Sequence, residues 1–244
     1  MSGLASYREP AEPAFLFDLD GTLIDSVYQH VIAWRNALTR RGIDLSVWRI
    51  HRRIGMSGGL FVSALMRETG LDLSAADIEA LQQAHADEYT AQAGSVRPLP
   101  GAAELLAHLT ERGVRWTIAT SGRAATARLA LPLLGLPADV PMVTRDMVRH
   151  AKPDPDLFLA AAAQLGVEPR DAMVVGDSVW DLLAARRAGS LGIGLMSGGY
   201  GREELERAGA YRVYADPAEL LARADELGVR GLTRGAGPLA AGPQ

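Results

Sequence analysis

The sequence contains no cysteine, and this absence removes several kinds of chemistry at the outset. It excludes a disulfide framework, a thiolate zinc site and a cysteine nucleophile. It also fits a reducing compartment, so we expect a cytoplasmic protein. Lysine is nearly absent too: of 25 basic residues, 24 are arginine and one, Lys152, is lysine. Codon bias is one explanation for the arginines, but our hypothesis is that position 152 needs a compact ammonium that guanidinium cannot replace.

The chain also lacks the patterns of membrane and nucleic-acid-binding proteins. Its longest apolar run, 157–163, is less than half of the roughly 18 residues that a membrane span requires. Residues 1–13 do not have the basic-then-apolar order of a signal peptide. The net charge is -4, and the arginines are scattered singly or in pairs, which is a poor footprint for binding a polyanion. We therefore expect neither a membrane nor a nucleic acid as a partner.

Most of the chain alternates between strand and helix patterns, which predicts an α/β fold. Short apolar runs bounded by turn residues indicate buried parallel strands, and amphipathic segments lie between them. This order is typical of a doubly wound, Rossmann-like parallel sheet. We expect strands at 14–17, 114–119, 140–143, 173–175, 191–195 and 212–214, and helices at 102–112, 124–134, 155–165, 179–188 and 203–208.

One segment, 25–96, breaks this rhythm and reads as an inserted helical domain. It has three helical patterns, at 27–41, 59–69 and 75–91, with no convincing strand between them. Two prolines and a glycine at 97–101 are expected to end it and to stiffen its exit. The predicted organisation is therefore a core of residues 1–24 and 97–228, a helical insertion of residues 25–96, and a flexible Gly/Ala/Pro-rich tail at 229–244.

The first candidate site follows the first predicted strand, in FLFDLDGTLIDS. Asp18 and Asp20 project to the same face of an extended segment, because side chains alternate with a period of two. They stand at the carboxyl end of a strand, where open parallel sheets bind ligands. Gly21 and Thr22 follow at once and offer backbone amides and a hydroxyl. The alternative is a plain turn that caps the next helix.

Three further polar sites follow other predicted strands or precede helices. Thr120, Ser121 and Gly122 come directly after the strand at 114–119, either as ligand-binding groups or as a helix cap. Lys152 stands in a loop that Pro153 and Pro155 fix.

The last site follows the strand at 173–175, in VVGDSVWD. Asp177 and Asp181 are four residues apart, which is one helical turn, and they too could form only a capping arrangement.

Taken together, these residues point to phosphoryl transfer. Asp18, Asp20, Asp177 and Asp181 would repel one another unless a hard dication and a cation neutralised them. Lys152 supplies the cation, and carboxylates suit Mg²⁺ as ligands. Mg²⁺ together with a lysine, a hydroxyl and backbone amides is what a transferring phosphoryl group requires.

The motifs DLDGTLIDS, ATSG, KPDPDLF and GDSVWD stand in an order that resembles the haloacid dehalogenase superfamily. The resemblance is to its Mg²⁺-dependent phosphatases with a helical cap inserted after the first motif, such as phosphoglycolate phosphatase-like and phosphosugar phosphatase-like members. It covers the chain from residue 15 to about 221. It implies hydrolysis of a small phosphorylated metabolite.

The resemblance also implies roles for the carboxylates. Asp18 would be the nucleophile that forms an aspartyl-phosphate. Asp20 would be the general acid and base, with its backbone carbonyl on Mg²⁺. Asp177 would bind Mg²⁺ directly, and Asp181 directly or through water. Because Asp20 must carry a proton in the first step, we expect that proton to depend on the neighbouring carboxylates and on closure of the cap.

For the substrate, the resemblance implies that Thr120 and Lys152 hold phosphoryl oxygens. Amides near Gly21 and Ser121 would bind the equatorial oxygens. The cap loop at 53–59 is expected to select the leaving group. The expected substrate-binding residues are Gly21, Thr22, Ser121, Gly122, Arg53, Gly55 and Met56.

Other members of the superfamily fit less well. The dehalogenases lack the second aspartate of the first motif, and phosphonate hydrolases use a cap lysine. A β-phosphoglucomutase-like phosphotransferase shares His30 and Trp34, but its cap arginine would fall near Gly58 and its cap lysine near His85. A catalytically silent binding module stays a further alternative. A nucleotide-cofactor enzyme is disfavoured, because no G-x-G-x-x-G follows the first strand.

Overall fold

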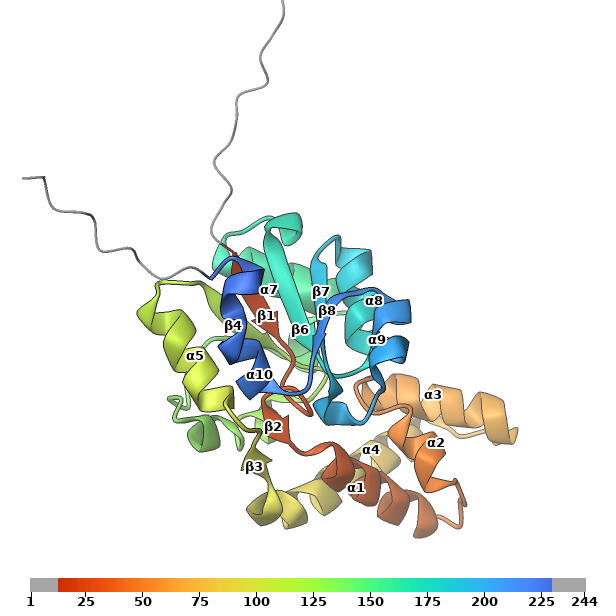
Figure 1. Ribbon diagram of the computed structural model, residues 1–244. Helices are drawn as coiled ribbons and strands as arrows, with labels where there is room; N and C mark the ends of the chain where they lie inside the picture. Colours follow the sequence, from red (N-terminus) through yellow and green to blue (C-terminus); the bar gives the residue numbers. More distant parts are fainter. Residues whose placement is uncertain (1–12, 230–244) are drawn as a thin grey trace, which may run out of the picture.

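The computed structural model describes residues 13–229, in which a six-stranded parallel sheet forms the centre (Figure 1). The strand order is β5-β4-β1-β6-β7-β8. The chain leaves β1 towards β4 and β5, and later returns to β6 on the other side of β1. This confirms the predicted doubly wound sheet. The strands are β1 Ala14–Phe17, β4 Trp116–Ala119, β5 Met142–Val143, β6 Ala172–Gly176, β7 Leu191–Leu195 and β8 Ala210–Tyr214.

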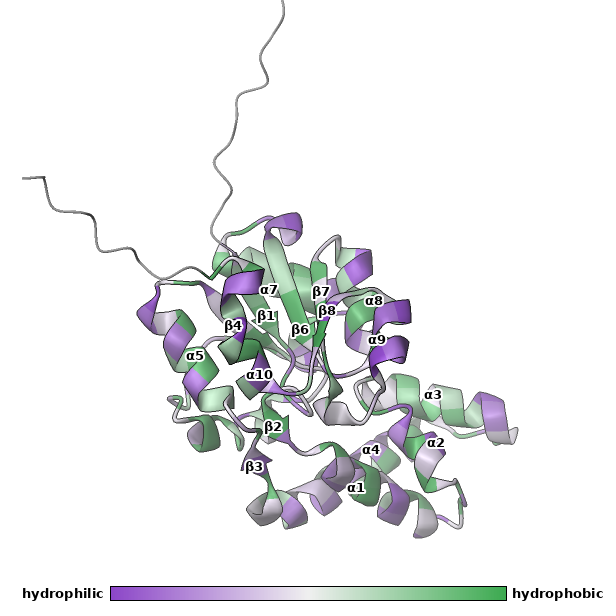
Figure 2. Ribbon diagram, viewed as in Figure 1, coloured by the Kyte–Doolittle hydropathy of each residue, from purple (hydrophilic) through white to green (hydrophobic). Residues whose placement is uncertain are grey.

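Helices cover both faces of this sheet, so its strands are buried throughout. In β1, Phe15 and Phe17 face one hydrophobic cluster and Leu16 faces the other, as the alternation of side chains requires. The first cluster includes α5 (Ala102–Glu111) and α10 (Pro217–Ala222), and the second includes α7 (Asp156–Leu165) and α8 (Val179–Ala188). The hydropathy colouring shows the apolar strands between these helices (Figure 2).

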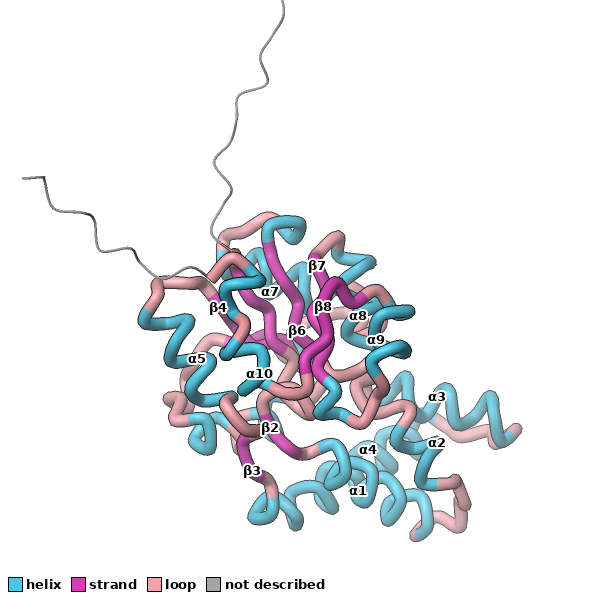
Figure 3. Tube along the Cα trace, in the orientation of Figure 1, coloured by secondary structure: helices cyan, strands magenta, loops and turns pink. Residues whose placement is uncertain are grey.

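Four helices lie together beyond the carboxyl ends of the strands, between the short strands β2 (Ile24–Asp25) and β3 (Arg97–Pro98) (Figures 1 and 3). β2 and β3 pair antiparallel, so the chain enters and leaves this segment at one place. The helices pack around a hydrophobic cluster of their own. They are α1 Val27–Thr39, α2 Val47–His51, α3 Gly58–Thr69 and α4 Ala75–Gln92. We call this segment the cap.

Several predicted elements differ from the structure. The helix expected at 124–134 is divided into α6 (Ala124–Ala127) and the 3₁₀ turn η2 (Leu131–Leu134), because Pro132 cannot donate to a continuing helix. The strands expected at 114–119 and 140–143 begin only at Trp116 and Met142. Helices α2 and α10 and the pair β2–β3 were not expected.

The remaining helix of the core is α9 (Arg202–Ala208), which packs beside α8. Of the tail predicted at 229–244, only Val229 lies within the described residues, and its side chain is buried. None of the helices in residues 13–229 is long and apolar enough to cross a membrane.

Candidate active site

The end of β1 carries the two aspartates of the first motif. The amide of Asp18 donates to the carbonyl of Val175 (2.9 Å), which continues the pairing of β1 with β6. Asp18 is 3% exposed, whereas Asp20 is half-buried. Gly21 turns the chain away with φ +83°, a conformation that disfavours other residues. The strand end therefore places both carboxylates at the switch point of the sheet, between β1 and β6.

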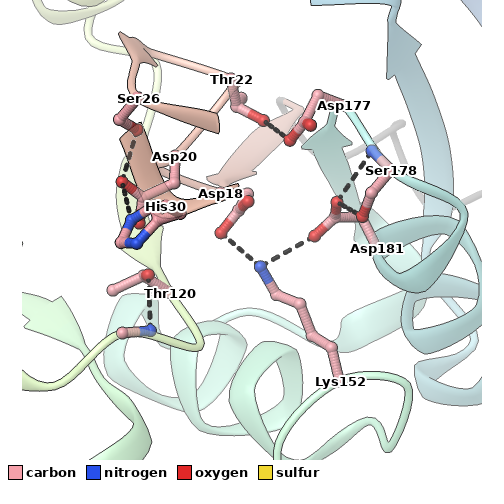
Figure 4. Close-up of polar contacts among 11 residues, drawn as sticks. Asp18, Asp20, Thr22, Ser26, His30, Thr120, Lys152, Asp177, Ser178 and Asp181 are labelled. Atoms are coloured by element: carbon pink, nitrogen blue, oxygen red, sulfur yellow. Dashed lines mark hydrogen bonds and ion pairs between the residues drawn. The ribbon is translucent and has the colours of Figure 1, made fainter. Parts of the chain in front are cut away.

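Lys152 reaches this point from the loop before α7 (Figure 4). Its side chain is fully buried, and Nζ contacts Asp18 Oδ1 and, at 2.8 Å, Asp181 Oδ1. Burial lowers the pKa of Lys152, but the two carboxylates outweigh it and raise that pKa above its usual value. The lone lysine of the sequence is therefore a charged group held between two aspartates.

Asp18, Asp177 and Asp181 form a cluster of three buried carboxylates, with oxygens within 4.8 Å of one another. Thr22 Oγ1 donates to Asp177 Oδ1 (3.1 Å). The backbone amide and hydroxyl of Ser178 donate to Asp181 Oδ2, at 3.1 and 2.5 Å. The capping arrangement weighed for Asp181 thus exists, but it uses one oxygen and leaves Oδ1 to Lys152.

Two glycines give these carboxylates room. A Cβ on Gly198 would lie 1.7 Å from Asp177 Oδ2, and one on Gly176 would lie 2.3 Å from the Cβ of Asp181. Both distances are far inside contact distance. The loop after β7 and the end of β6 therefore accept the aspartates only because these two positions have no side chain.

The cluster fits a divalent cation of the Mg²⁺ type. Burial raises the pKa of Asp18 to about 7, although Lys152 opposes the shift. Burial, then Asp181 and Asp18, raise the pKa of Asp177 well above its usual value. Three buried carboxylates against one ammonium thus lack positive charge. Mg²⁺ takes oxygen ligands, and the donors gathered here are all oxygens.

Asp20 faces the cap instead of the cluster. Its Oδ1 accepts from Ser26 Oγ (2.6 Å) and lies 3.2 Å from Nε2 of His30 on α1. The other ring nitrogen of His30 lies 3.1 Å from Nε2 of His85 on α4. Burial and the neighbouring His30 lower the pKa of His85 well below its usual value.

These contacts add a neighbour that the expectation for the proton of Asp20 did not include. Burial raises the pKa of Asp20, but the charge and hydrogen bond of His30, with Ser26, outweigh burial and lower it below its usual value. The sequence argument considered only neighbouring carboxylates and water exclusion. In the structure the strongest neighbour is a histidine, so Asp20 is an ionised carboxylate.

The loop after β4 brings hydroxyls to the same edge of the sheet. Thr120 Oγ1 accepts from the amide of Gly122 (2.9 Å), and Ser121 Oγ is buried without a hydrogen-bond partner among the described residues. The alternative that Thr120 or Ser121 caps the next helix is wrong. Arg123 stands at the N-cap of α6 and its side chain makes no capping hydrogen bond; the amide of Ala124 donates instead to Asp146 Oδ2.

A cavity of about 340 Å³ lies between this edge and the cap. Among the expected substrate-binding residues, Ser121, Gly122, Arg53, Gly55 and Met56 line it, together with Asp18, Asp20 and Thr120.

Three of the residues expected to bind substrate are otherwise engaged. The amide of Gly21 donates to Ile24 O (2.7 Å), the hydroxyl of Thr22 donates to Asp177, and neither residue lines the cavity. The guanidinium of Arg53 contacts Glu68 and the carbonyl of Arg49. A tight turn and an ion pair within the cap thus already occupy these donors.

A second set of contacts, between cap and core, was not predicted. The carbonyl of Arg52 accepts from Nε1 of Trp180 (3.2 Å) and from the hydroxyl of Tyr200 (3.0 Å). The guanidinium of Arg52 pairs with Glu204 (2.5 Å), and Nε2 of His51 lies 2.8 Å from the carbonyl of Gly198. The cap loop is thus bound to α8, which carries Asp181, and to the segment after β7, whose Gly198 packs against Asp177.

The fold and the site together define an α/β enzyme whose site lies between a parallel sheet and an inserted helical segment. The chain belongs to the haloacid dehalogenase-like hydrolases, whose family model matches residues 13–189. This confirms the resemblance seen in the motifs.

Individual relatives share most of their length with the chain. Hexitol phosphatase A of Escherichia coli strain K12 is 34% identical over 177 residues, 72% of this chain and 79% of that protein. A phosphoglycolate phosphatase of Rhodospirillum rubrum is 33% identical over 214 residues, 85% of this chain and 88% of that protein. Among solved structures, a hydrolase from Pseudomonas syringae has 52% sequence identity and a TM-score of 0.86, over 88% of this chain and 98% of that one.

Proposed function

We propose that this enzyme is a Mg²⁺-dependent phosphatase that hydrolyses small phosphate monoesters through an aspartyl-phosphate on Asp18. The observation that carries the proposal is the buried ammonium of Lys152, which lies between Asp181 and Asp18; Asp18 in turn lies beside Asp177 and lines the cavity. The names of two relatives, a hexitol phosphatase and a phosphoglycolate phosphatase, support the reaction type. Phosphorylated metabolites of the cytoplasm are the proposed substrates.

In the first step, a carboxylate oxygen of Asp18 attacks the phosphorus atom. The bond from phosphorus to the ester oxygen breaks, and that oxygen takes a proton from Asp20. In the second step, a water molecule gives a proton to Asp20 and attacks the same phosphorus, which releases inorganic phosphate and restores Asp18.

The surrounding residues bind the phosphoryl group and would hold the metal ion. Lys152 orients the nucleophile and draws the negative phosphoryl group towards it. The hydroxyls of Thr120 and Ser121 donate to phosphoryl oxygens, because neither hydroxyl proton has an acceptor among the described residues. Asp18 and Asp177, with the backbone carbonyl of Asp20, would hold Mg²⁺, and Asp181 would support it. When bound, Mg²⁺ supplies the positive charge that offsets repulsion between the carboxylates and the ester.

Asp20 fits the base of the second step as the structure has it, since its pKa is low. For the first step it needs a proton. A dianionic ester bound beside it raises the pKa of a carboxyl group, because two negative charges in a buried site disfavour each other. Substrate binding and the loss of water from the cavity thus promote the protonated form.

The phosphotransferase alternative requires the cap to grip a second phosphate with a cation. Gly58 stands near the expected position and has no side chain, and Arg53 is paired with Glu68. We therefore propose that the intermediate is passed to water. Phosphorus NMR with β-glucose 1-phosphate and a trace of its 1,6-bisphosphate tests this: phosphate release faster than glucose 6-phosphate formation is expected, and the reverse contradicts it.

Hydrolysis of p-nitrophenyl phosphate by the purified protein tests the proposal as a whole. We expect turnover that needs Mg²⁺ and stops with a chelator. Asp18→Asn should abolish it, because an amide does not form an acyl phosphate. Turnover in that variant above about one percent of wild type, or activity that resists chelation, contradicts the proposal. The absence of any turnover with Mg²⁺ would favour the silent binding module.

A further inference from the structure

The wall of the cavity carries an arginine with no acidic partner. Arg123 follows the loop of Thr120 to Gly122, and its Nη2 donates to Oε1 of Gln82 on α4, at 3.2 Å. The side chain therefore runs from the core to the cap across the edge of the cavity. Among residues 13–229, no carboxylate lies within salt-bridge distance of it. Arg53, in the same wall, pairs with Glu68, which also pairs with Arg49.

Arg123 brings a cation to the part of the cap that lacks one. A Cβ on Gly58 would lie 3.3 Å from Cγ of Gln82, so Gly58 and Gln82 are direct neighbours. The guanidinium of Arg123, which donates to Gln82, therefore lies close to Gly58. A cation is therefore supplied to this corner by the core and not by the cap.

A second arginine, Arg145, lines the cavity beyond the end of β5. Its backbone amide donates to Gly122 O (3.0 Å), which fixes its turn against the loop of Thr120. Its Nη1 donates to the carbonyl of Val148, and it too has no acidic partner among the residues described. Asp146 is the one acidic side chain beside it in the wall, and its Oδ2 accepts from the amide of Ala124 (2.9 Å).

The order of strands sets the spacing between these arginines and the nucleophile. Asp18 directly follows β1, Thr120 directly follows the neighbouring β4, and Arg145 follows β5, the next strand out. Two strand spacings are about 10 Å. Along this edge of the sheet, the carboxylate of Asp18 is followed by the hydroxyl of Thr120 and then by Arg145. The distance from the first strand to the third is about the length of a pentose or hexose chain.

We propose that Arg123 and Arg145 form a second anion-binding subsite, which selects phosphate monoesters that carry another oxyanion at the far end of a sugar-length chain. The oxyanion is a carboxylate or a second phosphate. This inference rests on the proposed phosphatase function and narrows its substrates. Guanidinium groups match both oxyanions, since their paired donors fit two oxygens at once.

Three esters of one hexitol chain test the subsite: glucitol 6-phosphate, gluconate 6-phosphate and glucitol 1,6-bisphosphate. They differ only in the group at carbon 1, which is a hydroxyl, a carboxylate or a phosphate. For wild type we expect kcat/KM for at least one charged ester to exceed that for glucitol 6-phosphate by about tenfold, the worth of one charged hydrogen bond. The two charged esters distinguish carboxylate from phosphate.

Variants then connect the preference to the arginines. Arg123→Gln and Arg145→Gln should each reduce the ratio of kcat/KM between the charged ester and glucitol 6-phosphate. Arg149→Gln is the matched control, because Arg149 is exposed and lies outside the cavity wall. It should leave the ratio unchanged.

The outcomes separate the subsite from the reaction. Equal losses for charged and uncharged esters in Arg123→Gln would mean that Arg123 only ties the cap to the core, and would overturn the subsite. A wild type that prefers glucitol 6-phosphate would do the same. Failure to hydrolyse all three esters and p-nitrophenyl phosphate would instead refute the proposed function.

Discussion

Replacing the nucleophile should stabilise the metal-free protein while it abolishes turnover. Asp18 is buried in a cluster that lacks positive charge, which raises its pKa from 3.8 to about 7. Keeping it ionised above pH 7 therefore costs the native state about 4 kcal/mol, from roughly three pKa units at 1.36 kcal/mol each. Asn resembles the protonated carboxyl group in shape and does not bear this cost, so about 4 kcal/mol is the upper limit of the gain.

The effect should depend on pH with a definite sign. Because the native pKa lies above the unfolded value, the native state binds more protons between about pH 4 and pH 7, and its stability falls as the pH rises through that window. Asp18→Asn removes this slope. Asp177 has a raised pKa too, and the charge of Asp18 contributes to it, so the difference between the two proteins reports Asp18 together with its effect on Asp177.

Thermal unfolding followed by circular dichroism, with chelator present, measures this. At pH 8 a gain of even ~2 kcal/mol raises Tm by roughly 4–8 °C for a chain of this size, and at pH 4 the difference should vanish. Mg²⁺ should narrow the gap at pH 8 by stabilising wild type. Asp139→Asn, an exposed change of equal charge, is the control. A Tm for Asp18→Asn at or below wild type at pH 8, or an equal difference at both pH values, would refute the reasoning.

Three further substitutions test separate parts of the site. Lys152→Arg should lose nearly as much activity as Lys152→Ala, since the fully buried position holds a compact ammonium. Near-normal activity of Lys152→Arg would show that the site does not require lysine. Gly198→Ala should raise the half-saturating Mg²⁺ concentration at least about tenfold, because the added Cβ displaces the carboxylate of Asp177. Gly94→Ala is the control, since its Cβ meets no atom within 4 Å. Equal Mg²⁺ requirements for the two variants would contradict this. Tyr200→Phe should raise KM several-fold with little change in kcat, because it removes the hydrogen bond from the Tyr200 hydroxyl to the carbonyl of Arg52. Tyr211→Phe, at an exposed position, should change neither constant. Unchanged kinetics in Tyr200→Phe would show that this hydrogen bond does not hold the cap.

The core of the site could be predicted because it is local in sequence. Asp18 and Asp20 follow a strand whose apolar run is unmistakable, and the rarity of lysine drew attention to Lys152. Their convergence required only the rule that the carboxyl ends of parallel strands meet at one edge. The doubly wound sheet could be predicted because strand and helix patterns alternate along the chain.

The cap contacts could not be predicted because they join distant segments. His30, which lowers the pKa of Asp20, and His85 are 55 residues apart, and the contact between the two rings depends on how α1 packs on α4. The backbone carbonyl of Arg52 accepts hydrogen bonds from Trp180 and Tyr200 of the core. Every residue has such a carbonyl, so the residue type does not indicate this contact. The amide of Gly21 donates to Ile24 O within a tight turn, and the residue type alone does not indicate that bond.

The central claim, covalent transfer to Asp18, is tested most directly in Asp20→Asn. The p-nitrophenolate leaving group departs without a proton, so the first step proceeds, whereas the attack of water loses its base. We predict a burst of p-nitrophenolate equal to the enzyme concentration, and peptide mass mapping of the quenched protein should find one phosphoryl group on Asp18. Linear release without a burst, with an unmodified Asp18 peptide, would contradict the account.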